Sequence, residues 1–415
     1  MGLREDALKL HYDNKGKIEI FSKVAVTDRE SLSLAYTPGV AEPCKEIHAN
    51  PETIYDYTAK GNMVAVVSDG TAVLGLGNIG GRAALPVMEG KSILFKCFAG
   101  VDAFPICLNT TDIDKIVDIV SQIEPSFGGI NLEDIAAPAC FEIEKRLKEK
   151  LSIPVFHDDQ HGTAIIVLAA LINALKITGK KFSELTIVIN GAGAAGIAIA
   201  KILLNMGIKD LILCDKKGII FRGRKEGMNW AKEEIAQLTN KENKKGLLTD
   251  ALYGADIFIG VSAANILSDK MVKSMNDDPI IFAMANPVPE IDPDTAKKAG
   301  ARIVGTGRSD YPNQINNVLA FPGVLRGALD VRATDINEKM KVAAAYALSE
   351  IIPDEELNED YIIPKPFDPR VAPSVAKAVA KAAIESGVAR IKVSPEEIAS
   401  RTVELVKKAN RKNFN

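Results

Sequence analysis

Short apolar runs alternate with longer amphipathic segments along most of the chain. Apolar, β-branched runs bounded by turn residues predict strands, and apolar residues recurring every three or four positions predict helices. The expected strands are 63–68, 93–96, 128–132, 153–156, 185–190, 211–214, 255–260, 279–284 and 302–307. The expected helices are 111–123, 142–150, 163–178, 195–206, 340–351, 371–386 and 395–409, after a helix and lead-in over the first 30 residues or so. This alternation predicts an α/β fold with parallel sheets.

The length of the chain predicts more than one domain, because 415 residues exceed what a single core usually organises. We expect an N-terminal α/β substrate and catalytic domain over residues 1–160 and a doubly wound, Rossmann-type NAD(P)-binding domain over 161–385. A C-terminal helical segment, 386–415, closes the predicted arrangement. We found no internal repeat and no long disordered linker.

Composition excludes several classes of protein. A net charge of −3 gives no general reason to expect a nucleic-acid partner. The five cysteines form no Cys-x-x-Cys pair, which argues against a disulfide framework and a thiolate zinc site. The first residues carry mixed charges without an apolar core, and we identified no apolar run of membrane-spanning length. We therefore expect a cytoplasmic protein with no membrane partner.

Two pairs of carboxylates follow predicted strands. Glu133 and Asp134 come after the run 128–132, and Asp158 and Asp159 come after the run 153–156. Ligands of open α/β sheets bind outside the carboxyl ends of the strands, so the two pairs can meet there. Carboxylate oxygens suit Mg²⁺ or Mn²⁺ better than Zn²⁺. Each pair alone is more often a turn or a helix cap, but two pairs ahead of a cofactor motif favour a metal site.

The cofactor motif is the segment Gly191, Ala192, Gly193, Ala194, Ala195 and Gly196. It follows a strong strand, opens a helix and is followed by a second strand that ends at Asp215, which is the arrangement of a dinucleotide-binding fingerprint. A second Gly-x-Gly-x-x-Gly pattern, at Gly75, Gly77 and Gly80, lacks this context. Because Gly80-Gly81 would interrupt a helix here, we expect it to be a glycine-rich loop near a site rather than a second Rossmann unit.

A metal ion beside a nicotinamide ring suggests oxidation of a 2-hydroxy acid followed by loss of a β-carboxylate as CO₂. This chemistry needs a base for the hydroxyl and an acid for the enolate carbon, and Lys91 and Tyr36 are side chains of the right types. A nearby cation would lower the pKa of Lys91. From the pattern alone, however, Lys91 fits a surface position, and Tyr36 fits packing under the turn that follows it. His161 is expected to be a polar residue near the site rather than a metal ligand.

The chain resembles a malic enzyme of the short, prokaryotic type over almost its whole length. The matching stretches are 34–40, 68–80, 86–91, 133–134, 156–163, the fingerprint at Gly191, 282–289 and 316–323. The resemblance implies divalent-metal-dependent oxidative decarboxylation of (S)-malate to pyruvate and CO₂ with reduction of NAD(P)⁺. It also implies a homodimer or a higher homo-oligomer.

The resemblance further implies residue roles. Tyr36 would be the general acid for enolpyruvate and Lys91 the general base at the malate hydroxyl. Glu133, Asp134 and Asp159 would bind Mg²⁺ or Mn²⁺, with the catalytic acid Asp158 behind them. Asn286 and Asn317 match positions that contact malate or nicotinamide. Larger eukaryotic relatives carry an arginine where this chain has Thr71-Ala72, so the partner of the malate carboxylate is not identified.

The sequence leaves alternatives open for both the cofactor and the reaction. Asp215 favours NAD because it can accept from the ribose 2′-hydroxyl, whereas Lys216 and Lys217 could neutralise the 2′-phosphate of NADP. A malolactic enzyme would bind NAD but release lactate. A nucleotide-binding regulator that has lost catalysis would bind without turnover, and a metal-free amino-acid dehydrogenase would leave the paired acids unexplained.

Overall fold

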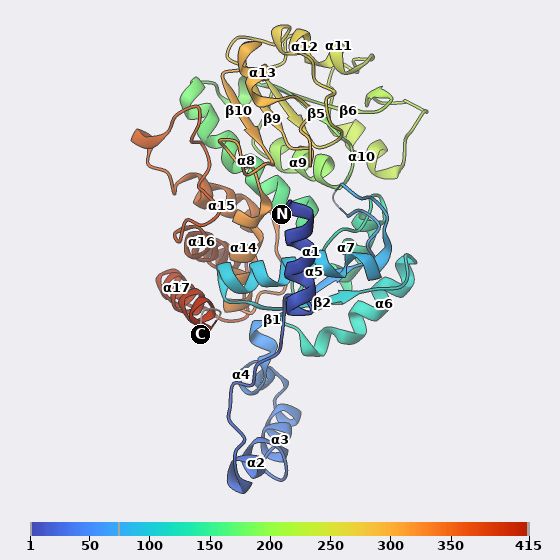
Figure 1. The fold of residues 1–415 in the computed structure, drawn as a ribbon. Helices are drawn as coiled ribbons and strands as arrows, with labels where there is room; N and C mark the ends of the chain where they lie inside the picture. Colours follow the sequence, from blue (N-terminus) through green and yellow to red (C-terminus); the bar gives the residue numbers. More distant parts are fainter. Residues whose placement is uncertain (1, 74, 413–415) are drawn as a thin grey trace.

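The computed structural model describes residues 2–73 and 75–412, with side chains described up to residue 410. Two mostly parallel sheets are surrounded by helices, with the smaller sheet in the N-terminal part of the chain (Figure 1). The strands are β1 (Met63–Ser68), β2 (Asp102–Cys107), β3 (Gly129–Leu132), β4 (Val155–His157), β5 (Thr186–Asn190), β6 (Asp210–Asp215), β7 (Gly218–Ile219), β8 (Ile257–Gly260), β9 (Ile280–Ala283) and β10 (Ile303–Thr306). The α-helices are α1 (Leu3–Asn14), α2 (Arg29–Ala35), α3 (Ala41–Ala49), α4 (Ile54–Tyr57), α5 (Gly80–Ala99), α6 (Ile113–Ile123), α7 (Ala139–Lys150), α8 (Asp158–Thr178), α9 (Ala194–Leu204), α10 (Trp230–Leu238), α11 (Leu248–Leu252), α12 (Asp269–Lys273), α13 (Pro293–Lys298), α14 (Phe321–Asp330), α15 (Glu338–Ser349), α16 (Val371–Glu385) and α17 (Pro395–Lys412).

The strand orders confirm the predicted α/β class. The first sheet has the order β2-β1-β3-β4, and all its strands are parallel. The second sheet has the order β10-β9-β8-β5-β6-β7, and only the short β7 is antiparallel among its described strands. In this second sheet β5 lies between β6 and β8, so the strand order reverses there, as in doubly wound folds.

Helices cover both faces of each sheet, which explains the continuous apolar runs of the strands. In β1, Val64 and Val66 pack into one core and Ala65 and Val67 into another, because successive side chains point to opposite faces. The C-terminal helices α14 and α17 pack against α5, so the end of the chain returns to the N-terminal part of the fold.

Helix α8 connects the two sheets. It begins directly after β4, and most of its side chains are buried against α9 and α15. By length and composition alone α8 could cross a membrane, so our estimate from the sequence that no run reaches this length was wrong. Its most apolar window is 72% buried inside the protein, which accounts for its composition as that of a central core helix.

Helix α5 corrects the interpretation of two segments. The predicted strand 93–96 lies within α5, and Gly80 opens this helix instead of preventing it. The buried positions of α5 recur every three or four residues, a helical pattern that the short run 93–96 does not reveal when taken alone. Gly81 allows α5 to pack closely, since a Cβ at this position would lie 2.4 Å from the carbonyl oxygen of Leu108.

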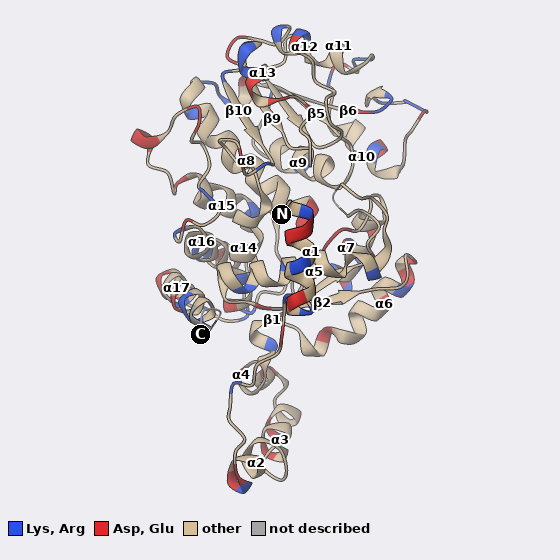
Figure 2. Cartoon of the chain, in the orientation of Figure 1, with Lys and Arg blue, Asp and Glu red and all other residues tan. Residues whose placement is uncertain are grey.

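Helices α2 and α3 form an arm that stands off from the rest of the molecule (Figure 1). The arm and the segment leading to it expose large apolar side chains, namely Ile20, Phe21, Val24, Val26, Leu32, Leu34, Tyr36 and Val40. Basic and acidic residues alternate over the visible elements of the whole molecule without one sign dominating (Figure 2). The arm is therefore distinguished by apolar exposure rather than by charge.

Candidate active site

The two predicted pairs of carboxylates come together at the carboxyl ends of β3 and β4. These strands are parallel neighbours in which Leu132 is opposite His157, so the residues that follow them meet at one edge. One oxygen from each of Glu133, Asp134 and Asp159 lies within 4.8 Å of the others. The backbone N–H of Asp134 donates to Asp159 Oδ2 at 2.8 Å, which joins the two segments directly.

The side chain of Lys91, which belongs to helix α5, contacts this acid cluster. Its Nζ lies 2.7 Å from Asp158 Oδ2 and 3.0 Å from Glu133 Oε1, and 4.2 Å from the centre of the Phe321 ring. Lys91 is only 8% exposed, so the surface position favoured by the sequence pattern was wrong. The side chain of Asn317 also donates to Asp158 Oδ2, at 2.7 Å.

The electrostatics of the cluster fit a bound cation. Burial, together with repulsion from neighbouring carboxylates, raises the pKa values of Glu133 and Asp158, and raises that of Asp134 to about 8. Burial alone raises the pKa of Asp159, against the opposing effects of Lys91 and the backbone N–H of Asp134. Burial also acts to lower the pKa of Lys91, but Asp158 and Glu133 outweigh it and the pKa is raised. The atoms Asp134 Oδ2 and Asp158 Oδ1 are buried without a hydrogen-bond partner. Crowded carboxylate oxygens that lack donors form the kind of site that Mg²⁺ and Mn²⁺ occupy in proteins.

The glycine-rich loop after β1 packs against the same edge. Thr71 Oγ1 accepts from the backbone N–H of Ala136 at 2.9 Å, and the N–H of Ala72 donates to the carbonyl of Asp134 at 2.9 Å. A Cβ built on Gly75 would lie 3.7 Å from the carbonyl oxygen of Asn286, beyond β9 of the second sheet. The loop therefore lies between the acid cluster and the second sheet.

The fingerprint has the predicted geometry of strand, glycine turn and helix. Gly191 follows β5 with φ +118°, and α9 begins at Ala194. A Cβ on Gly196 would lie 1.7 Å from the carbonyl oxygen of Gly191, so this position tolerates only glycine. The N-terminus of α9 is directed at the turn, where its free N–H groups favour an anionic pyrophosphate.

Asp215 ends β6 as expected, but two basic side chains that the sequence analysis did not identify bind it. Arg224 donates to both carboxylate oxygens, at 2.9 and 2.5 Å, and Lys232 donates to Oδ2 at 2.6 Å. Burial would raise the pKa of Asp215, but the hydrogen bonds from these two residues outweigh it and lower the pKa to about 2. Lys217 instead pairs with Glu226. These contacts weaken the inference that Asp215 alone favours NAD.

Tyr36 is not brought to the cluster within the chain. It caps α2 on the projecting arm, and 68% of its surface is exposed, so packing under the turn is also excluded. Figure 1 shows α2 well away from α5, which carries Lys91. The catalytic set predicted from the sequence is thus divided between two places in the fold.

The histidines near the acids have other contacts. His161 Nε2 lies 2.7 Å from Glu144 Oε1, on the side of α8 that faces α7. His157 is fully buried, and its Nδ1 lies 3.9 Å from Asp159 Oδ2. Among the described residues, the group of three possible metal ligands consists of acids alone, without a histidine.

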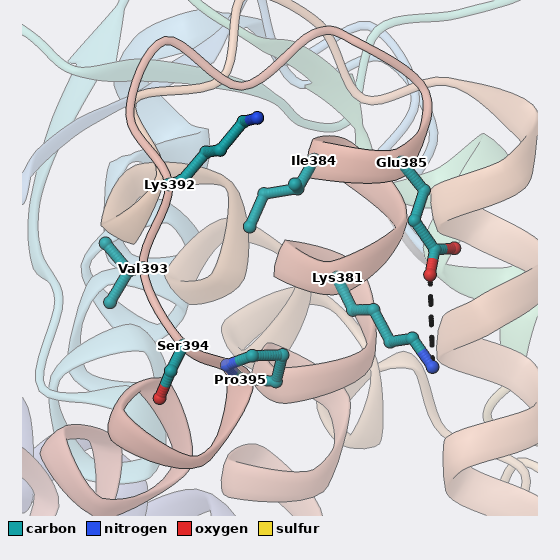
Figure 3. A pocket seen from close by; sticks show the side chains of 7 residues that line it. All are labelled: Lys381, Ile384, Glu385, Lys392, Val393, Ser394 and Pro395. Carbon is teal, nitrogen blue, oxygen red and sulfur yellow. Dashed lines mark ion pairs between the residues drawn. The ribbon is translucent and has the colours of Figure 1, made fainter.

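Two hollows lie outside the acid cluster. A cavity of about 550 Å³ lies between α7, α8, α9, α10 and α15, where Glu144 contacts the ring of His161 and Lys341 forms an ion pair with Glu338. A smaller groove of about 350 Å³ lies between α16 and the start of α17, beside the ion pair of Lys381 with Glu385 (Figure 3). Neither hollow is lined by a member of the acid cluster.

The first sheet gathers acids around a lysine, and the second sheet carries the glycine fingerprint. Together they define a dinucleotide-dependent oxidoreductase. Two family models match the chain: "Malic enzyme, N-terminal domain" at residues 15–148 and "Malic enzyme, NAD binding domain" at 160–384. The chain belongs to the malic enzyme family. The fold class and the family resemblance inferred from the sequence are thereby confirmed.

Known malic enzymes match this chain over most of its length. The bifunctional malic/malolactic enzyme of Bacillus subtilis (strain 168) is 65% identical over 405 residues, which cover 98% of this chain and 99% of the relative. The NAD-dependent malic enzyme of Geobacillus stearothermophilus is 60% identical over 376 residues, which cover 90% of this chain and 78% of the relative. The crystal structure of malic enzyme from Pyrococcus horikoshii Ot3 matches with a TM-score of 0.95 and 51% identity, covering 99% of this chain and 97% of that one. Both NAD- and NADP-dependent enzymes occur among the relatives.

Proposed function

We propose that this enzyme catalyses the oxidative decarboxylation of (S)-malate to pyruvate and CO₂, with reduction of NAD⁺ or NADP⁺. The observation that carries the proposal is the convergence of Lys91 and Asp158 with three further carboxylates beside the dinucleotide-binding sheet. Hydride leaves C2 of malate for the nicotinamide, and the resulting β-keto acid loses its β-carboxylate as CO₂.

Glu133, Asp134 and Asp159 are the residues that would hold Mg²⁺ or Mn²⁺. When bound, such an ion would acidify the malate hydroxyl and then polarise the new ketone. The unpartnered oxygen of Asp134 supports this ligand set. Asn131 supports it as well, because its side chain donates to Glu133 Oε2 at 2.9 Å and orients that carboxylate.

Lys91 is the proposed base for the C2 hydroxyl. A base has to be neutral before it accepts a proton, and without a cation Asp158 and Glu133 favour the charged form of Lys91. A cation held by the three acids would lower the pKa of Lys91, and Asp158 Oδ2, 2.7 Å from Lys91 Nζ, would then take the lysine proton. The raised pKa of Asp158 suits it to this role. Asn317 holds Asp158 from the other side, and we propose that Asn317 and Asn286 also contact malate or the nicotinamide.

Tyr36 of a second copy of this chain is the proposed acid that protonates enolpyruvate on carbon. Within one chain Tyr36 is exposed on the arm, and several apolar side chains are exposed with it. Exposed apolar surface of this kind marks protein–protein contacts. We therefore propose a homodimer in which each arm packs on the partner and completes the partner's active site. We further propose that this dimer is cytoplasmic and has neither a membrane nor a nucleic-acid partner.

A malolactic reaction is a second candidate, favoured by the name of the relative from Bacillus subtilis. In that reaction the NADH formed from malate reduces pyruvate to lactate before leaving, so no net reduction of the cofactor occurs. The same side chains serve both reactions, and the balance depends on whether pyruvate or lactate is released.

A product assay distinguishes these functions. The purified enzyme is incubated with malate, Mn²⁺ and either nicotinamide, and NAD(P)H, CO₂, pyruvate and lactate are measured. Equal amounts of NAD(P)H, CO₂ and pyruvate support the proposal, whereas lactate without NADH identifies a malolactic enzyme. Dinucleotide binding without turnover would contradict both functions and identify a regulator.

A further inference from the structure

Glu290 is a fully buried acid in the loop that follows β9. Its exposed fraction is 0%, and its carboxylate accepts two backbone N–H groups from different strand ends. Oε1 accepts from Ser262, which follows β8, at 3.0 Å. Oε2 accepts from Ala285, which follows β9, at 2.9 Å. One side chain therefore ties two neighbouring strands together at their carboxyl ends.

The network extends to the strand that precedes the fingerprint. Asn190, the last residue of β5, donates from Nδ2 to Ser262 Oγ at 2.6 Å, and Ser262 Oγ donates to Glu290 Oε1 at 3.4 Å. The N–H of Val261 donates to the carbonyl of Asn190 at 2.9 Å. The next residue, Gly191, packs so closely that a Cβ on it would lie 2.4 Å from the carbonyl oxygen of Val261.

Close packing fixes the position of the Glu290 carboxylate in addition to its hydrogen bonds. A Cβ on Gly260 would lie 2.4 Å from the carboxyl carbon of Glu290, so the acid rests directly on the end of β8. Asn286, a residue of the proposed site, follows Ala285 immediately, and its Nδ2 would be 2.7 Å from a Cβ on Gly307. A small movement at Ala285 would therefore displace Asn286.

Burying a carboxylate costs free energy that burying an apolar side chain would not. Burial raises the pKa of Glu290, while the hydrogen bonds from Ala285 and Ser262 oppose that effect. A buried charge is tolerated when it is fully hydrogen-bonded, and here its donors all belong to the edge at which dinucleotides bind.

We propose that Glu290 is a positioning residue for the dinucleotide. It fixes the strand ends at 260–262 and 284–286 relative to the glycine turn at 191, so that the edge is already shaped for the cofactor before binding. This role goes beyond the proposed function but, like it, rests on dinucleotide binding at the carboxyl edge of the second sheet. Since Glu290 is not proposed to touch the cofactor, its effect would pass through the loops.

Asp256 offers a matched control at the opposite edge of the same sheet. It is also buried, 8% exposed, and its Oδ2 accepts the backbone N–H of Thr186 at 2.9 Å, which joins the start of β8 to the start of β5. Asp256→Asn and Glu290→Gln each remove the charge of a buried carboxylate that accepts a backbone N–H of this sheet, and Asp256 is in addition paired with Lys180 at 3.0 Å. Only Glu290 lies at the edge where the dinucleotide binds.

The test measures NADH and NADPH binding by fluorescence titration without malate, together with the Tm and Mn²⁺ affinity of each variant. Both variants are expected to lower the Tm. Glu290→Gln keeps one acceptor and should weaken dinucleotide binding about tenfold, as expected for loss of a charged hydrogen bond, and Glu290→Ala should weaken it further. Asp256→Asn should leave it unchanged, and neither Glu290→Gln nor Asp256→Asn should alter Mn²⁺ affinity.

An equal loss of Tm in both variants with unchanged dinucleotide affinity would overturn the proposal and leave Glu290 a structural residue. Glu290→Gln decides the question if Glu290→Ala does not fold. Because the titration contains no malate, failure of the proposed reaction would appear in the product assay and not here.

Discussion

The ammonium group of Lys91 and the carboxylate of Asp158 form a buried ion pair with an N–O distance of 2.7 Å. The pair joins the middle of α5 to the first residue of α8, so it connects two helices that belong to different parts of the fold. We expect this contact to serve catalysis and stability together.

Replacing Lys91 by methionine keeps the volume of the side chain and removes its charge. Malate oxidation should fall by about 10²-fold or more, as for the loss of a general base, while the dinucleotide Kd should be unchanged. The free energy of unfolding of the metal-free protein should fall by about 3–5 kcal/mol because Asp158 and Glu133 lose their buried counterion. Lys96→Met, on the same helix but partly exposed, is the control. Near-normal kcat in Lys91→Met would refute the assigned role.

The cations around Asp215 predict which dinucleotides the enzyme accepts. Arg224 and Lys232 already neutralise the carboxylate, so a 2′-phosphate would meet positive charge as well as Asp215. We expect measurable activity with NADP as well as NAD. Lys232→Gln should lower kcat/KM for NADP about tenfold or more, as for loss of a charged hydrogen bond, with a small effect for NAD.

The control for this experiment is Lys216→Gln, which removes an exposed cation next to Asp215. It should leave the ratio of kcat/KM values for the two cofactors unchanged. A ratio that does not respond to Lys232→Gln would remove this lysine from the cofactor site.

Two inactive variants should restore activity when they are mixed. If Tyr36 acts in the partner's site, a heterodimer of Tyr36→Phe and Lys91→Met chains contains one site with both native residues. Random reassortment should recover about a quarter of the wild-type activity, since half of the dimers carry one intact site of two.

The mixing experiment requires that subunits exchange, for instance after dilution and reconcentration, and each variant alone serves as its own control. Light scattering should give the mass of a dimer or a higher oligomer. Activity that stays at the level of the separate variants, although exchange is verified with tagged chains, would show that Tyr36 does not act in trans.

Metal affinity should depend on pH through Asp134. Its pKa is raised to about 8 by burial and by the charges of Asp159 and Glu133. Below that pH the carboxyl group is protonated and must release its proton before it binds a cation, so Mn²⁺ affinity should rise up to about pH 8, by at most about tenfold per pH unit for one proton. Asp134→Asn should bind Mn²⁺ more weakly and with a smaller pH dependence. A wild-type affinity that is constant between about pH 6 and pH 8 would contradict this account.

Much of the site follows from the sequence because parallel strands end at a shared edge. This rule brought Glu133 and Asp134 to Asp159 and placed Gly191 and Asp215 correctly, using only the order of strands and turns. Helix α5 shows where such local patterns fail. The four residues 93–96 are apolar or amphipathic and fit a strand as well as a helix. Only the spacing of buried positions over the whole of α5 shows that they are helical.

Other features depend on tertiary contacts that no local pattern encodes. Lys91 is buried only because Asp158 and Glu133 compensate its charge, and those partners lie 67 and 42 positions away in the sequence. Arg224 and Lys232 reach Asp215 from a loop and the helix after it, with no motif spacing to mark them. Tyr36 is 68% exposed on the arm, so its surroundings in one chain do not reveal the role proposed for it.

The proposed mechanism requires Glu133, Asp134 and Asp159 to act as one cation site. Titration of the metal-free enzyme with Mn²⁺, monitored by electron paramagnetic resonance, tests this directly. We expect a single tight Mn²⁺ site per chain that Mg²⁺ competes for. Asp159→Asn should weaken binding by about tenfold or more, as for loss of a ligand carboxylate, while Asp256→Asn should bind normally. Unchanged Mn²⁺ affinity in Asp159→Asn would contradict the convergence of the two acid pairs on one ion.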